Sequence, residues 1–528
     1  MTTTHARSGE TAETRRAAAR LLPRQRVRQF GAGLRRSGAA GGYSRAPWVL
    51  GAVVCAGWAF GFPLISNLAS QRAWGWSAGA GYLLAALVAA LLPRGRSGDA
   101  ARPIRVAVAI ALLGGIVIPL VLLLVLGQAQ SEVFVVQQSA ARLVHTGSPY
   151  LPHPAHWTGY TPYLPGMTLF GFPHLVLPAV LGDARIWFLL AFLLCLVLAW
   201  RILRGGPLAV PFAAVVASPL VALPAAVSGV DLPMIGGCIL ALALAGRGNA
   251  ARAGVVLGLV CALKWTAWPA VPVALLLLLQ MGGRRAALRG LLWTGLVGGV
   301  LVLPFALAFP QAMLEQVVRF PLGLSKVRTP AGSPLPGHIL AQMGPDGRTA
   351  SLVLFGLSGL AVCAWLVARP PRDARVACDR LALGVALAFL LAPAGRFGYL
   401  QLPVLLVLWP RLALRTRRPD SVPVLLASNE DPADDAGEVH SVASRLAVHG
   451  RASVPGTAES DAPAPSRDAV HARAAAHPDR ALRPARTRTD RADRVSRTDG
   501  APRGERSAQV DRTDQDQADH AASAAARS

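Results

Sequence analysis

Acidic side chains are almost absent from the long apolar part of this chain. Between Pro47 and Pro410 only eight occur, and none lies in the middle of an apolar run: Asp99, Glu132, Asp183, Asp231, Glu315, Asp346, Asp373 and Asp379. The apolar runs repeatedly reach the roughly 20 residues that cross a bilayer. With 53% hydrophobic and 15% charged residues, the sequence predicts an all-α integral membrane protein rather than several soluble cores.

Positive charge predicts the orientation of the helices. The formal net charge of +25 comes from arginines in the N-terminal segment, in short loops and in the tail. That distribution is typical of helix orientation and contact with anionic lipids, so we expect no nucleic-acid partner. Residues 1–46 are expected to be an arginine-rich, disordered cytoplasmic segment. Residues 411–528 have too little apolar sequence to form a core, and we expect a disordered cytoplasmic tail.

The membrane domain is expected over residues 47–410, with about twelve crossings and both termini in the cytoplasm. Residues 165–181 are broken by three prolines and are expected to lie along the outer interface. Residues 253–280 are too long for one ordinary crossing, so we divide them at Lys264-Trp265. The spans are expected near 47–66, 75–93, 104–127, 185–203, 207–226, 232–246, 253–264, 265–280, 290–309, 350–368, 381–395 and 398–410.

With this topology, Glu132 begins a polar outer loop that extends from about Gln128 to Tyr163. Asp231 and the chain's two lysines, Lys264 and Lys326, also fall on the outer side. Lys264 stands at an apolar helix end, where a cation needs a partner or access to the interface. It is either a snorkelling anchor or a phosphate contact.

Metal and cofactor motifs are missing from the sequence. The six cysteines lack metal-ligand spacing, and the outer-loop histidines His145, His153 and His156 are weak evidence for a metal. We predict no cofactor and leave a divalent-metal requirement open. His145 is expected to have a structural role or to contact an acceptor.

Seven short segments carry a resemblance to a known family. They are Glu132–Phe134, Ala140–Leu143, Gly147–Tyr150, Tyr160–Pro165, Ala253–Leu259, Ala262–Lys264 and Arg396–Tyr399. Together they resemble glycosyltransferase family 87, the actinobacterial mannosyltransferases that use polyprenyl-phosphate mannose and have the GT-C membrane fold. The resemblance covers about 104–410. The family's outer loop usually begins with Asp where this chain has Glu132, and a Gln-containing motif is expected near Ser228–Asp231.

The resemblance implies a GT-C-like helical bundle in the plasma membrane with its active site on the outer face. It implies transfer of a hexose, by resemblance mannose, from a polyprenyl-phosphate donor to a glycan or glycolipid acceptor with inversion. Membrane lipids are the remaining partners. An enzyme of this kind needs a base for the acceptor hydroxyl and cations for the departing phosphate.

Candidate residues for each role follow. Glu132 is the candidate base, and the alternative is that it is an ordinary loop acid. Asp231 is a candidate second base or acceptor contact, and the alternative is that it simply caps the helix that follows. The candidate phosphate contacts are Lys264, Lys326, Arg328 and Arg396. The candidate substrate contacts are Tyr150, Tyr160, Tyr163 and His145.

Two other functions remain open at this stage. A transporter or flippase of lipid-linked sugars would place polar sites near the bilayer midplane, often in repeated halves. The chain has no evident repeat and no carboxylate within a span. A non-catalytic membrane scaffold with an interaction tail is the other alternative.

Overall fold

The computed structural model describes residues 44–93, 101–206, 210–327 and 329–415. Every regular element in these ranges is a helix, and the only extended pairing is an isolated bridge between Gly332 and Gly395. The predicted all-α class is therefore confirmed for the described residues. The predicted disordered segments fall almost entirely on residues 1–43 and 416–528, which lie outside these ranges.

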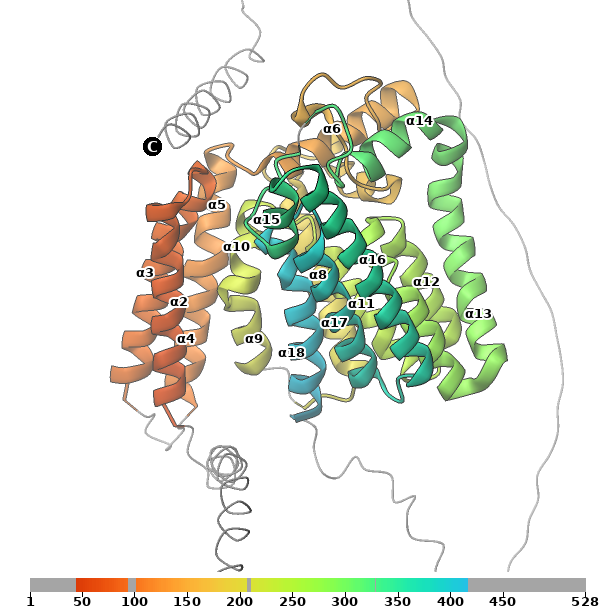
Figure 1. Ribbon diagram of the computed structural model, residues 1–528. Coiled ribbons are helices and arrows are strands. Elements are labelled where there is room, and N and C mark those ends of the chain that lie inside the picture. The colour runs from red at the N-terminus through yellow and green to blue at the C-terminus, as the bar shows by residue number, and fades with distance from the viewer. Residues whose placement is uncertain (1–43, 94–100, 207–209, 328, 416–528) are drawn as a thin grey trace, which may run out of the picture. The chain divides into compact units, whose positions relative to one another are not determined.

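The first helices form a group at one side of the remaining helices (Figure 1). α2 (Ala46–Ile65) packs along α3 (Ala69–Leu91), and α3 packs along a third, nearly continuous helix. That third helix consists of α4 (Arg102–Leu112), a π-helical turn η1 (Leu113–Val117) and α5 (Ile118–Val125).

The remaining long helices surround α11 (Leu232–Ala245), all of whose residues are buried. α8 (Ala184–Ile202) and α12 (Ala250–Cys261) pack against it, as do parts of α13, α17 and α18. A helix that is apolar on every side is stable in this central position because it exposes no polar face. The other elements here are α9 (Val210–Ala217), α10 (Pro219–Val227), α13 (Ala270–Ala308), α16 (Pro345–Ala368), α17 (Ala374–Leu391) and α18 (Gln401–Arg415).

Seven helices in the described ranges are long and apolar enough to cross a membrane. They are Ala46–Ile65, Ala69–Leu91, Arg102–Val125, Ala184–Ile202, Trp265–Ala308, Pro345–Ala368 and Phe397–Arg415. α9 and α10, bent by 55° at their junction, add an eighth if they form one span. The chain is thus a multi-pass helical membrane protein. The expected count of about twelve crossings stays a prediction.

Two predicted breaks are present in the helices. α12 ends at Cys261 and α13 begins at Ala270, with the 3₁₀ turn η4 (Trp265–Ala267) between them, so the division at Lys264-Trp265 is confirmed. α13 itself is interrupted at Gly282 and Gly283, where the backbone leaves helical geometry and Gly283 has a φ of +69°. This break separates the expected spans 265–280 and 290–309. A positive φ is readily available only to glycine.

The proline-rich stretch 165–181 forms only short elements, as expected from its three prolines. η3 (Pro165–Phe170) is a 3₁₀ helix and α7 (Pro173–Val176) is a single α-helical turn. Neither is long enough to cross a bilayer.

The predicted polar loop from Gln128 to Tyr163 is helical in its first half. Residues Ser131–Thr146 form the helix α6, which lies at one end of the helices together with α14 (Pro310–Met313) (Figure 1). Val133, Val136 and Ala140 repeat at helical spacing and are buried, and Gly147 ends the helix with a φ of +72°. The helix was not predicted because polar residues surround this apolar stripe in the sequence.

Close packing of α3 on η1 depends on two glycines that face each other. A Cβ added at Gly81 would lie 2.6 Å from the Cα of Gly114, so the backbones would have to separate. We expect Gly81→Ala to destabilise the protein by about 1–3 kcal/mol, as overpacking does. The thermal unfolding midpoint of the purified protein in detergent measures this. Gly57→Ala is the control, because a Cβ there meets nothing within 4 Å; an equal effect of both changes would contradict the packing argument.

Candidate active site

Glu132 and Arg396 form an ion pair between distant parts of the chain. Glu132 stands in the first turn of α6, where a carboxylate is favoured by the helix dipole. Arg396 immediately precedes the 3₁₀ turn η6 (Phe397–Leu400). The Arg396 Nη1 donates to Glu132 Oε1, and the two side chains are 35% and 14% exposed. The structure therefore brings one predicted carboxylate and one predicted cation together.

Asp231 and Lys264 form a second ion pair. Asp231 precedes α11, and Lys264 follows α12 at the turn into η4. Lys264 Nζ lies 2.7 Å from Asp231 Oδ1, with the side chains only 10% and 21% exposed. The Asp231 side chain makes no capping hydrogen bond to its helix, so the simple helix-cap interpretation is not supported.

Two tyrosine rings join these ion pairs into one cluster. Lys264 Nζ lies 4.7 Å from the centre of the Tyr399 ring and 5.8 Å from that of Tyr163. Burial raises the pKa of Tyr163 well above its usual value, and the negative charges of Glu132 and Asp231 raise it further. Both carboxylates thus act on the same phenol, which stays protonated and is unsuited to be a base near neutral pH. We call these six residues the charged cluster: Glu132, Tyr163, Asp231, Lys264, Arg396 and Tyr399.

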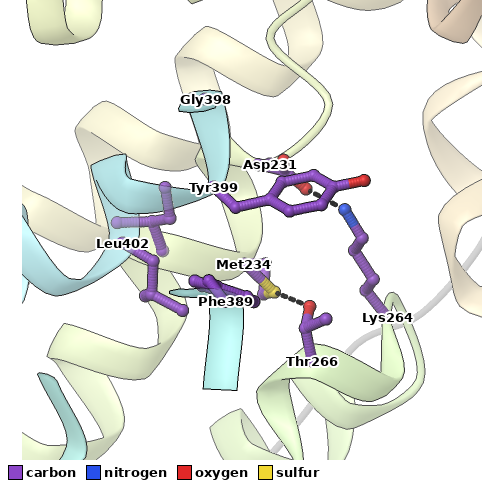
Figure 2. Close-up of a pocket in the computed structure, with 9 residues that line it drawn as sticks. Asp231, Met234, Lys264, Thr266, Phe389, Gly398, Tyr399 and Leu402 are labelled. Carbon is purple, nitrogen blue, oxygen red and sulfur yellow. Dashed lines mark hydrogen bonds and ion pairs between the residues drawn. The ribbon is translucent and has the colours of Figure 1, made fainter. Parts of the chain in front are cut away.

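A small pocket opens beside the charged cluster. Figure 2 shows Lys264 reaching toward Asp231 beside the Tyr399 ring, with Thr266, Met234 and Phe389 below them. The Thr266 hydroxyl donates to the Met234 sulfur at 3.2 Å. The pocket therefore combines one ion pair with an otherwise mainly apolar lining.

Backbone hydrogen bonds hold Tyr163 beside Lys264. The N–H groups of Leu164 and Gly166 donate to the carbonyls of Leu263 and Ala262, each at 3.0 Å. A Cβ at Gly166 would lie 2.7 Å from the Ala262 oxygen, so only glycine permits this approach. The segment that follows α12 is thereby fastened to the segment that carries the tyrosine.

A buried arginine fastens the two chain segments that lead to the carboxylates. Arg185 is 1% exposed and is held by Asp183 through its Nε and Nη2 atoms, both at 2.9 Å. Its Nη1 donates to the carbonyls of Gln128 and Ala226, each at 2.9 Å. These carbonyls lie four residues before Glu132 and five before Asp231. Arg185 is therefore a positioning residue for both acids.

The segment before η6 is fixed by a loop from the 330s. Ser333 N donates to Gly395 O and Gly395 N donates to Ala331 O, both at 3.0 Å, and Phe397 N donates to the Ser333 hydroxyl at 3.3 Å. These contacts fix the backbone on both sides of Arg396. The loop after α14 thus positions the cation that pairs with Glu132.

Two further predicted tyrosines are buried near the cluster. Tyr150 is 1% exposed and its hydroxyl donates to the Tyr163 carbonyl at 3.1 Å. Tyr160 stacks on Phe320, with the ring centres 4.1 Å apart. The buried Gln316 accepts from Thr161 N at 2.9 Å and so ties this segment to η5 (Leu314–Arg319). Tyr150 therefore holds the backbone of Tyr163 in place, and Tyr160 packs its segment against Phe320.

Two of the remaining candidates, His145 and Lys326, form no ion pair with the described residues of the charged cluster. His145 lies exposed in the last turn of α6, and Lys326 is exposed in the loop after η5. Arg328 lies outside the described residues. Within the described part of the chain no group of three or more His, Cys, Asp or Glu side chains could hold a metal ion.

Sequence reasoning did not assign roles to Tyr399 or Arg185. Tyr399 was visible only as part of the Arg396–Tyr399 segment, and no motif indicated that its ring meets Lys264. Arg185 follows an acid at the start of an apolar helix, which resembles an ordinary interfacial charge. Its burial was the missing information.

Comparison with known proteins supports the resemblance to a known family. Residues 160–393 match the model of glycosyltransferase family 87. The predicted resemblance to glycosyltransferase family 87 is therefore confirmed over these residues. The matched range contains Tyr163, Asp231 and Lys264, whereas Glu132 and Arg396 flank it and reach the same site through the fold. No curated protein and no solved structure matches the chain.

Proposed function

We propose that this membrane glycosyltransferase has a GT-C-like bundle and transfers a hexose from a polyprenyl-phosphate donor to an extracytoplasmic glycan or glycolipid. Mannose is the sugar that the family resemblance suggests. The observation that carries the proposal is the charged cluster, in which two carboxylates and two cations meet beside a pocket. This combination supplies both a base and a phosphate site.

The reaction is a single displacement at the anomeric carbon. The acceptor hydroxyl oxygen attacks that carbon, the bond from the carbon to the phosphate oxygen breaks, and polyprenyl phosphate leaves with the bonding electrons. Glu132 takes the hydroxyl proton. Attack from the face opposite the leaving group inverts the anomeric configuration. Lys264 and Arg396 stabilise the negative charge that gathers on the phosphate.

Each cation is already paired with a carboxylate before the donor binds. A donor phosphate placed between Lys264 and Arg396 offers both a second anionic partner, which weakens their hold on the acids. Glu132 then becomes a stronger base for the acceptor proton, because a nearby cation favours the unprotonated carboxylate. Asp231, beside Lys264 and the pocket, is suited to accept a hydrogen bond from another acceptor hydroxyl.

The aromatic ring of Tyr399 should help to hold the phosphate-binding ammonium. Tyr399→Leu is expected to weaken donor binding about fivefold or more, because the cation–π contact with Lys264 is lost. Tyr399→Phe retains the ring and should bind the donor like the parent. Equilibrium binding of a labelled donor measures both. Equal loss in the two variants would assign the effect to the hydroxyl instead.

The distribution of arginines supports an outer location of the cluster. α11 and α12 are joined by a turn that contains Arg247, and Asp231 and Lys264 stand at their other ends. α17 begins next to Arg372 and leads to Arg396. Arginine-rich turns face the cytoplasm in membrane proteins, which supports the proposed location of the cluster at the outer face of the plasma membrane.

Cysteine labelling tests this orientation. A cysteine at the exposed Ala155, in the segment between α6 and Tyr163, should react with an impermeant thiol reagent in intact cells, while one at the exposed Asn249 should react only after lysis. The six native cysteines are replaced beforehand. Labelling at Asn249 but not at Ala155 in intact cells would reverse the proposed orientation.

Transfer by the purified protein tests the activity itself. The full chain in detergent receives labelled polyprenyl-phosphate mannose and a panel of glycan and glycolipid acceptors, and labelled product is measured. Sugar transfer that requires Glu132 supports the proposal. Movement of intact donor across reconstituted vesicles without transfer would instead support the transporter.

A further inference from the structure

The side chain of Arg380, on α17, packs against an aromatic ring. Its guanidinium carbon lies 4.8 Å from the centre of the Trp365 ring on α16. Its Nη1 atom is buried and has no hydrogen-bond partner among the described residues. The side chain is therefore held by an aromatic ring but lacks an anion.

Asp373 and Asp379, the two acidic residues of this segment, already bind other groups. Asp379 receives the two terminal nitrogens of Arg411, one of them at 2.8 Å. Asp373 accepts from the backbone N–H of Val376 at 2.8 Å and caps α17. In the described ranges no carboxylate forms an ion pair with Arg380. A guanidinium in this state retains several unused donors.

The surroundings of Arg380 are positive. Arg369 and Arg372, in the turn between α16 and α17, lie close enough for their charges to act on it. Arg375 is exposed on the first turn of α17. Four arginines thus share a region whose two acids are already bound.

This arginine region lies at the end of the bundle opposite the charged cluster. A Cβ on Gly246, at the end of α11 away from Asp231, would lie 2.7 Å from Ala374, the first residue of α17. Arg380 is about 9 Å further along α17, at 1.5 Å per residue. Trp365 is 37% exposed there, as is typical of a tryptophan at the boundary of headgroups and acyl chains.

We propose that Arg380, Trp365 and the arginines of the α16–α17 turn bind the headgroup phosphate of an anionic phospholipid. The Arg380 side chain is only partly buried, so a lipid phosphate at this depth can supply acceptor oxygens to its unused donors. The surplus of positive charge favours anionic over zwitterionic lipids. The site is separate from sugar transfer and does not depend on the proposed function.

Lipid-dependent thermal stability of the full chain tests the site. The protein in detergent is titrated with phosphatidylglycerol, with phosphatidylcholine of the same acyl chains, and with inorganic phosphate. Phosphatidylglycerol should raise the unfolding midpoint of the parent. Arg380→Gln should need at least about tenfold more of this lipid for the same protection, because charge-assisted hydrogen bonds are lost.

Arg285→Gln is the matched control, since Arg285 is exposed in another arginine-rich turn, at the break in α13. It should respond to phosphatidylglycerol like the parent. Without lipid, Arg380→Gln should leave the midpoint unchanged or raise it, because it removes a positive charge that no described carboxylate pairs with and that Arg369 and Arg372 repel. A purely structural Arg380 would lower it.

Three results would overturn the proposal. Equal protection of the parent and Arg380→Gln by phosphatidylglycerol would show that Arg380 does not bind the headgroup. Equal protection by phosphatidylcholine would exclude selectivity for anionic lipid. Equal protection by inorganic phosphate would assign the site to a soluble anion.

Discussion

Glu132→Gln should lower turnover by about 10²-fold or more, because glutamine keeps the size of the side chain but accepts no proton from the acceptor hydroxyl. Donor binding should be retained or become tighter. Arg396, no longer neutralised by its ion-pair partner, is then fully available to the donor phosphate. Single-turnover transfer and equilibrium binding of labelled donor measure the two effects separately.

Asp346→Asn is the matched control for Glu132→Gln. Asp346 is an exposed acid in the first turn of α16 and has no contact with the charged cluster. The control should transfer sugar at the parental rate. If Glu132→Gln also folds and transfers at that rate, Glu132 is not the base, and Asp231 becomes the remaining carboxylate of the cluster to test.

Lys264→Met should weaken donor binding by about tenfold or more and reduce turnover as well. The ammonium is proposed to contact the phosphate in both the ground state and the transition state, so its removal affects both quantities. This pattern differs from that expected for Glu132→Gln, in which binding survives.

Lys264→Met alone leaves Asp231 without its cation in a site where the Asp231 side chain is only 21% exposed. An unpaired buried charge destabilises a protein, so loss of activity alone would be ambiguous. Asp231→Asn combined with Lys264→Met removes both charges and should recover thermal stability while donor binding stays weak. Parental donor affinity in the folded double variant would exclude Lys264 as a phosphate contact.

Much of the architecture was predictable from local sequence. Apolar length, the positions of prolines and the positions of charges are properties of short windows, and the bilayer restricts such windows to helices. The break at Lys264-Trp265 and the short elements within 165–181 were found in this way. α6 was missed because its apolar stripe lies within a polar segment, where composition and periodicity disagree.

The sequence also selected four of the six residues in the charged cluster by their charge, their predicted outer-side position and the family resemblance: Glu132, Asp231, Lys264 and Arg396. Their partners were not predictable. Glu132 and Arg396 are 264 positions apart, and Asp231 and Lys264 are 33 apart. No sequence pattern over either interval predicts that the two residues at its ends meet.

The sequence by itself determined that this chain is a multi-pass helical membrane protein with a few charged groups at the ends of apolar helices. Charges are excluded from the middle of spans by their desolvation cost, and that rule acts residue by residue. Only the tertiary structure decided that Glu132 meets Arg396, that Tyr399 covers Lys264, and that Arg185 is buried between the segments leading to both acids. These contacts depend on how distant helices pack, and packing is a property of the whole bundle.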